Sequence, residues 1–155
     1  MDKINSNKCL IEGVTLTELR QISDERGAVL HMLRSDAAEF THFGECYFSE
    51  VLPHAVKAWK CHYAQTQNLA VPVGRIRVVI YDDRKPSLTR GKLQVIELGR
   101  PDAYLRLRIP PGLWHGFTCI STTPSLLVNC ADLPHDPTES EVKPLNDPTI
   151  PYQWN

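Results

Sequence analysis

The stretch NLAVPVGRIRVVIYDDRKPSLTRGKLQVIELG, residues 68–99, decides the fold class. It contains three runs rich in β-branched and other apolar residues, at 68–73, 75–81 and 92–98, which are separated by Gly74 and by a charged turn. Runs of this length, bounded by Gly, Pro, Asp and Ser, are typical of β-strands joined by tight turns. The stretch therefore predicts consecutive antiparallel strands.

Similar apolar runs lie on both sides of this stretch, at spacings near the roughly 8–12 residues that are typical of β-sandwiches and barrels. No amphipathic helical pattern lies between them, which argues against parallel βαβ units. The segment Ser35–Phe40 permits one or two helical turns, because it begins with two residue types that favour helix N-caps. We expect an all-β, antiparallel barrel or jelly roll whose further strands lie at 45–51, 104–109, 116–120 and 125–129.

The length and charge of the chain limit its partners. A chain of 155 residues is about the size of one domain, so we expect a single domain spanning residues 1–155. The 17 Lys and Arg residues nearly cancel the 18 Asp and Glu residues, which gives no electrostatic reason to bind nucleic acid or an anionic membrane. The polar N-terminus lacks the apolar run of a secretory signal, so we expect a cytoplasmic protein without a membrane partner.

Three features give local expectations. The five cysteines have no CxxC spacing, and we expect reduced, mostly buried thiols. Tyr81–Ser87 predicts a strand end that runs into a solvated, charged turn. The tail from Pro134 is polar and Pro-rich but ends in Tyr152 and Trp154, so we expect it to pack against the barrel.

Two of the six histidines are candidates for chemistry. His62 precedes a core strand, and His115 follows the turn-forming Pro-Pro-Gly, so we expect both side chains to point into one cavity. An HxH metal motif is missing, because Ala64 stands at the partner position and glutamines follow where a carboxylate should stand, so we expect no metal site. Cys61 lies beside His62, but adjacent strand residues point to opposite faces, so it is a poor nucleophile for that base.

Four blocks, in this order, carry a family resemblance: GVTLTELRQISDERGAVLHML, LAVPVGRIRVVIYDDRKPSLTRGKLQVIEL, LRLRIPPGLWHGF and LNDPTIPYQW. Together with the His62 segment they resemble the dTDP-4-dehydrorhamnose 3,5-epimerase family. The resemblance implies a cupin-type jelly-roll barrel, a homodimer, and a nucleotide-linked 4-keto-6-deoxy sugar bound in the barrel mouth. It also implies no metal and no organic cofactor, and a reaction that removes and returns protons beside the sugar ketone.

The resemblance assigns expected roles to individual residues. It implies that His62 is the catalytic base, that His115 lines the same pocket, and that Arg26 of the DERG motif contacts the nucleotide. Trp59 takes the position of a phosphate-binding arginine, with Lys60 beside it as a substitute. Gln67 takes the position of the lysine that would hold the enolate oxygen, and it is expected to hydrogen-bond the substrate.

Two further family positions differ. The tyrosine that acts as general acid falls on Val128 or Asn129, and the aspartate that orients the base falls beyond Asn155. A base without its carboxylate is less well oriented, and loss of an acid typically costs about 10²–10⁴-fold in rate. These changes predict proton exchange that is slow or confined to one carbon.

The sequence is compatible with three candidate functions. The first is an epimerase or isomerase that acts on a nucleotide-linked 4-keto-6-deoxy sugar in polysaccharide or deoxysugar biosynthesis. The alternative is a catalytically impaired module that binds a carbohydrate or sugar nucleotide on the same fold. The third is a metal-dependent cupin oxygenase. Elemental analysis addresses the third, and solvent deuterium exchange separates the first from the second.

Overall fold

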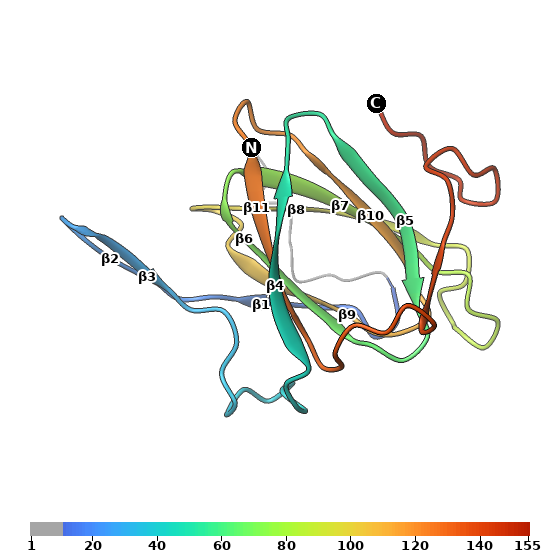
Figure 1. Ribbon diagram of the computed structural model, residues 1–155, viewed down its shortest axis with the longest axis horizontal. Helices are drawn as coiled ribbons and strands as arrows, with labels where there is room; N and C mark the ends of the chain where they lie inside the picture. The colour runs from blue at the N-terminus through green and yellow to red at the C-terminus, as the bar shows by residue number, and fades with distance from the viewer. Residues whose placement is uncertain (1–10) are drawn as a thin grey trace.

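The computed structural model describes residues 11–155. Two five-stranded antiparallel sheets enclose a common core (Figure 1). The first sheet contains, in spatial order, β1 (Thr15–Glu18), β9 (Leu105–Ile109), β6 (Gln67–Val73), β11 (Ser125–Ala131) and β4 (Glu45–Val51). The second contains β12 (Ser140–Val142), β5 (Val56–His62), β10 (Trp114–Cys119), β7 (Arg75–Tyr81) and β8 (Leu93–Gly99).

Alternation along the strands builds the core. Ile76, Val78 and Ile80 on β7 face Leu69 and Val71 on β6, and all five side chains are at most 2 % exposed. Burying such a side chain contributes roughly 1.5–3 kcal/mol relative to leaving it exposed. The apolar runs of residues 68–99 therefore supply facing strands of both sheets.

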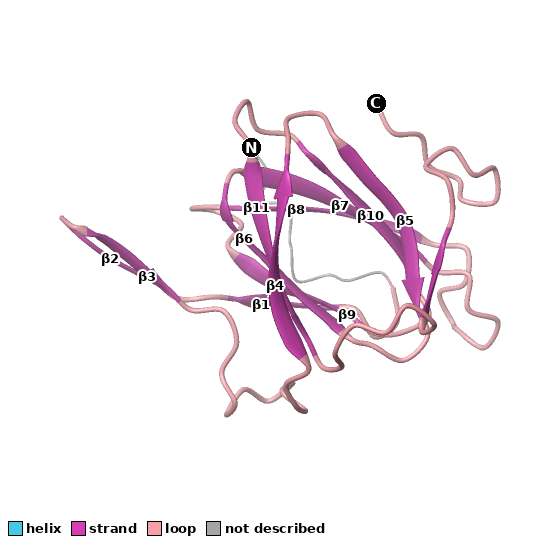
Figure 2. Ribbon diagram, in the orientation of Figure 1, coloured by secondary structure: helices cyan, strands magenta, loops and turns pink. Residues whose placement is uncertain are grey.

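The predicted all-β, antiparallel jelly roll is confirmed. The described chain consists of strands and loops (Figure 2), and each of the seven expected strands is present with ends shifted by at most two residues. Residues 35–40 form two successive turns and no helix, because Ala37 N–H bonds to Arg34 O and Phe40 N–H bonds to Ala37 O, each three residues back.

The C-terminal tail packs on the outer face of the second sheet, as expected. The Trp59 ring lies 5.2 Å from that of Trp154 and 6.3 Å from that of Tyr152, and Ile150 is buried beside them. The backbones of Trp59 and Lys143 exchange two hydrogen bonds of 3.0 Å. The tail thus covers an aromatic cluster that would otherwise face solvent.

The cysteines agree only in part with the expectation. Cys61 and Cys119 are buried and Cys130 is half-buried, but Cys46 is exposed on β4. All four are free thiols. Cys9 lies outside the described residues.

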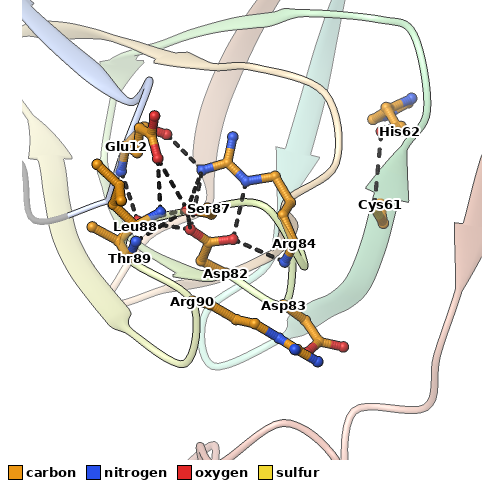
Figure 3. Close-up of polar contacts among 10 residues, drawn as sticks. All are labelled: Glu12, Cys61, His62, Asp82, Asp83, Arg84, Ser87, Leu88, Thr89 and Arg90. Atoms are coloured by element: carbon orange, nitrogen blue, oxygen red, sulfur yellow. Dashed lines mark hydrogen bonds and ion pairs between the residues drawn. The ribbon is translucent and has the colours of Figure 1, made fainter.

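The turn after β7 exposes most of its residues, as the sequence predicts, but it also contains one buried carboxylate that the sequence did not indicate (Figure 3). The Asp82 side chain is fully buried and accepts hydrogen bonds from Arg84, Ser87 and Thr89. Burial acts to raise the pKa of Asp82, but these hydrogen bonds outweigh it and hold the pKa far below its usual value. The turn is therefore solvated, but it is fixed by a polar cluster around the buried Asp82 carboxylate.

Replacing Asp82 with alanine is expected to destabilise the fold by about 3 kcal/mol, because it leaves Arg84 and two hydroxyls without their acceptor. Chemical denaturation measures this change. Asp83→Ala, which removes an exposed carboxylate 3.4 Å from Arg90, is the control and should cost under about 0.5 kcal/mol. Since the folded pKa is lowered, the contribution of Asp82 is present above pH ~4 and is lost as the pH falls below it. Equal stabilities of the two variants would contradict this account.

A two-stranded hairpin, β2 (Gln21–Asp24) with β3 (Gly27–Leu30), projects away from both sheets (Figure 1). Ile22 is 45 % exposed and Val29 is 61 % exposed. An isolated two-stranded hairpin is at best marginally stable in water, so this one needs a packing surface beyond those that the rest of residues 11–155 provides.

Candidate functional site

A cavity of about 270 Å³ opens between the two sheets and contains both candidate histidines. His62 ends β5 and His115 lies on the neighbouring β10, and both side chains are buried. Their rings stack nearly parallel, with centroids 5.9 Å apart. The expectation that both point into one cavity is confirmed. The lining residues are Tyr47, Ser49, Lys57, Ala58, Trp59, Lys60, His62, Gln67, Leu69, His115, Phe117, Leu127 and Val142.

Close strand pairing positions the two histidines. The Gly112 N–H, in the turn before β10, donates to His62 O at 2.7 Å. A Cβ atom at Gly116 would lie 2.5 Å from the Cβ of Ala58, so only glycine lets β10 approach β5 this closely. Gly116, which follows His115 directly, therefore allows the close strand approach that places the His115 imidazole beside that of His62.

A carboxylate that the sequence analysis missed orients His62. Glu139 Oε1 bonds to His62 Nδ1, and Glu139 Oε2 accepts the N–H groups of Ala64 and Gln65, each at 3.0 Å. The expectation of a base without its carboxylate is therefore wrong. Strand β12 pairs with β5 and sets Ser140 opposite His62, which brings the preceding residue, Glu139, onto the ring.

The electrostatics of this pair favour a charged carboxylate. Burial acts to raise the pKa of Glu139, but hydrogen bonds from His62, Ala64 and Gln65 outweigh it and lower the pKa below its usual value. With Nδ1 engaged by Glu139, Nε2 is the ring nitrogen of His62 that remains for a ligand. The arrangement is that of a general base held by an anionic partner.

His115 differs from His62 in its surroundings. Burial, followed by the proximity of His62, lowers the pKa of His115 to about 3. The ring is therefore neutral at physiological pH. Its Nδ1 is fully buried and has no side-chain partner among the described residues, while a backbone contact with Leu113 acts weakly against the lowering of the pKa.

Gln67 is part of a polar network on the wall opposite His62. Its amide bonds to Gln65 on one side and to Asn129 on the other, and Asn129 Nδ2 also donates to the Tyr47 hydroxyl at 2.9 Å. Gln67 is only 2 % exposed. It therefore lines the cavity, but its amide groups already have protein partners.

The two predicted phosphate-binding substitutes are separated by strand alternation. Lys60 lines the cavity on the same face of β5 as His62, and its Nζ has no ion-pair partner within residues 11–155. Trp59 borders the cavity, but its indole packs under the tail and Nε1 donates to Leu145 O at 3.2 Å. The indole of Trp59 therefore packs in the outer cluster, and a substrate-binding role for this residue stays a prediction. Cys61 also lies in this outer cluster, as the alternation predicts.

The structure does not bring Arg26 to the cavity of its own chain. Arg26 lies at the tip of the projecting β2–β3 hairpin, where its side chain is 82 % exposed and bonds to Asp24 at 2.6 Å. Any contact of Arg26 with a ligand requires a site outside this cavity.

A larger hollow, of about 390 Å³, lies on the other side of the first sheet near the base of the hairpin. Arg20, His31 and the buried Arg106 line it, together with Glu39. It contains neither His62 nor Glu139. Within residues 11–155, no three His, Cys, Asp or Glu side chains are grouped as metal ligands, and no helix is long and apolar enough to cross a membrane.

Comparison with known proteins agrees with this geometry. The family described as dTDP-4-dehydrorhamnose 3,5-epimerase matches residues 8–155. Spore coat polysaccharide biosynthesis protein SpsL of Bacillus subtilis is 32 % identical over 94 % of this chain and 97 % of its own. A Haloferax volcanii protein named "Probable low-salt glycan biosynthesis epimerase" is 38 % identical over 94 % of this chain and 95 % of its own. The crystal structure of a dTDP sugar isomerase from Desulfovibrio desulfuricans has a TM-score of 0.92 at 56 % identity, over 94 % of this chain and 92 % of that one.

Proposed function

Because the chain belongs to the dTDP-4-dehydrorhamnose 3,5-epimerase family, we propose that its cavity binds a nucleotide-linked 4-keto-6-deoxy sugar and epimerises it beside the ketone. The relatives named for polysaccharide and glycan biosynthesis support a place for this reaction in the same kind of process. The observation that carries the proposal is the His62–Glu139 pair, buried in a cavity between the sheets.

His62 is the proposed base. A proton on the carbon beside a ketone is acidic enough to be removed only if the base is well oriented and the resulting enolate is stabilised. Glu139 fixes the ring of His62 and stabilises the imidazolium that forms when Nε2 takes the proton. The neutral His115, parallel to His62, offers a hydrogen bond to the sugar without competing for that proton.

The cavity is large enough for only part of the proposed substrate. About 270 Å³ lies just below the roughly 300–1,000 Å³ of sites that enclose a drug-sized ligand. The sugar ring therefore occupies the cavity, while the diphosphate and nucleoside extend outward. Lys60, in reach of the cavity and without a competing carboxylate in the described chain, is the proposed contact for the diphosphate. Gln67 contributes to the polar wall against the sugar.

We also propose a homodimer of single-domain chains. The projecting hairpin exposes Ile22 and Val29, and β4 is an edge strand of the first sheet that pairs, among the described strands, with β11 on one side. Docking of the hairpin on a second copy would bury these side chains and move Arg26 toward the nucleotide of a substrate held by that copy. The cytoplasmic location and the absence of a cofactor stay predictions.

The dimer proposal predicts twice the chain mass in sedimentation equilibrium at micromolar concentration. Replacing Ile22 and Val29 together with aspartate should weaken the dimer at least tenfold, because two charges would be buried at the interface. The exposed Val95 on β8 is the control site, and Val95→Asp should leave the dimer constant unchanged. A monomeric wild-type protein would overturn the proposal.

The epimerase proposal is tested by the product. The protein is incubated with a dTDP-linked 4-keto-6-deoxy sugar, and proton NMR follows the appearance of an epimer, while calorimetry measures binding. Epimer formation supports the enzyme. Binding without any epimer supports the alternative, a module that has kept the pocket and lost turnover, and refutes the proposal.

A further inference from the structure

The cavity wall that faces His62 carries a phenol that the resemblance does not assign. On β4, Val51 packs into the core, and strand alternation places Ser49 and Tyr47 on that same inner face. Tyr47 lines the cavity together with His62. Because β4 belongs to the first sheet and β5 to the second, these two side chains approach a bound sugar from opposite walls.

The hydrogen bonding of Tyr47 leaves its proton free. Asn129 Nδ2 donates to the Tyr47 hydroxyl oxygen at 2.9 Å, so the phenol acts as acceptor in this bond and its own O–H remains for a ligand. Burial raises the pKa of Tyr47, while the bond from Asn129 opposes this rise. The phenol thus stays protonated at neutral pH, and the amide of Asn129 stabilises the phenolate once the proton has left.

The other polar groups of this wall do not match that role. Ser49 Oγ accepts a 2.8 Å bond from Lys57, and its hydroxyl is a far weaker acid than a phenol. The amide of Gln67 is held by Gln65 and Asn129. Lys60 and His115 lie on the second sheet, on the same side as His62, so neither reaches the opposite face of the sugar.

We infer that Tyr47 is the general acid of this protein, delivering a proton to the face of the sugar carbon opposite His62. This inference rests on the proposed epimerase function and adds to it the residue that completes inversion. The family tyrosine falls at Val128 or Asn129 in the sequence, and Tyr47 is the direct cross-strand partner of Asn129. Compared with the family, the phenol of this protein therefore lies on the neighbouring strand, where the Cβ atoms of cross-strand partners are about 5 Å apart.

The proton balance of the step is complete. His62 Nε2 takes the proton from the carbon beside the ketone, the C–H bond breaks, and its electron pair moves to the ketone oxygen as an enolate. The electron pair then returns to carbon, which takes the Tyr47 proton on the opposite face, leaving a phenolate bonded to Asn129. The imidazolium gives its proton to solvent, and the phenolate takes one from solvent, so the protein returns to its starting state.

The test separates proton removal from inversion. Tyr47→Phe removes only the hydroxyl, and because Tyr47 is 42 % exposed, this change should leave the melting temperature within about 2 °C of wild type. In deuterated water, the variant should still exchange label into the carbon beside the ketone, because His62 is intact. Epimer formation should fall by about 10²–10⁴-fold with little change in KM. Tyr63→Phe, which removes an exposed hydroxyl bonded to Glu141 outside the cavity, is the matched control and should keep the wild-type rate.

Two outcomes overturn the inference while leaving the proposed function standing. One is epimer formation by Tyr47→Phe at the wild-type rate. The other is an equal loss of exchange and epimer formation together with a lowered melting temperature, which would place Tyr47 in the structure and not in the chemistry. If wild-type protein forms no epimer at all, the proposed function itself has failed. As a further readout, Asn129→Leu should slow epimer formation more than exchange, because it removes the donor that stabilises the phenolate.

Discussion

Replacing His62 with asparagine is expected to lower the rate of proton exchange by at least about 10³-fold, because the side chain loses its basic nitrogen while keeping its polarity and most of its volume. Binding of the sugar nucleotide should change less than tenfold, since the cavity walls from the first sheet and Lys60 remain. Solvent exchange followed by NMR and titration calorimetry measure the two quantities.

The control for this variant is His42→Asn, which changes an exposed histidine outside the cavity. It should keep both the rate and the affinity of wild type. Exchange by His62→Asn within tenfold of the wild-type rate would remove the base assignment.

Replacing Glu139 with glutamine is expected to lower kcat by about 10²–10⁴-fold with little change in KM. The charge that stabilises the His62 imidazolium is lost, and an amide NH₂ would face the N–H donors of Ala64 and Gln65 or the ring nitrogen. Steady-state kinetics measure the effect. The control is Glu141→Gln on β12, two residues after Glu139, which changes a carboxylate bonded to the exposed Tyr63.

The lowered pKa of Glu139 predicts how the activity depends on pH. Since hydrogen bonds hold the pKa of Glu139 below its usual value, the carboxylate stays charged throughout the neutral range. Activity should not fall through protonation of Glu139 until the pH drops below about 4.5, the ordinary pKa of the group. Wild-type kcat in Glu139→Gln would show that the carboxylate has no part in catalysis.

The fold was largely predictable from local pattern, because strands buried on at least one face need apolar or alternating runs. The strand at the centre of the site, β5, was expected only around Cys61 and His62, and its full extent, VKAWKCH, was not predicted. Its alternation is masked because the tail covers its outer face, so Trp59 and Cys61 are buried on one side and His62 on the other. The short strands β1, β2, β3 and β12 have only three or four residues, which is too few to show a period.

The site was predictable in part, for a related reason. His62 and His115 stand in motifs beside turn signals, so their place could be inferred from sequence. Glu139 lies 77 residues from His62 in a polar, proline-rich tail, and only the pairing of β12 with β5 brings the two together. Tyr47 belongs to a strand with aromatic residues at successive positions, and its contact with Asn129 depends on the β4–β11 register.

Deuterium incorporation in D₂O tests the central claim most directly, namely that the His62–Glu139 pair removes a proton beside the ketone of a nucleotide-linked sugar. The substrate is a dTDP-linked 4-keto-6-deoxy sugar, and NMR follows label at the two carbons that flank the ketone. We predict label at one or both carbons with wild-type protein, and a loss of this label in both His62→Asn and Glu139→Gln. A bound sugar that stays unlabelled, or label that enters equally fast in the His62 variant, would contradict the claim.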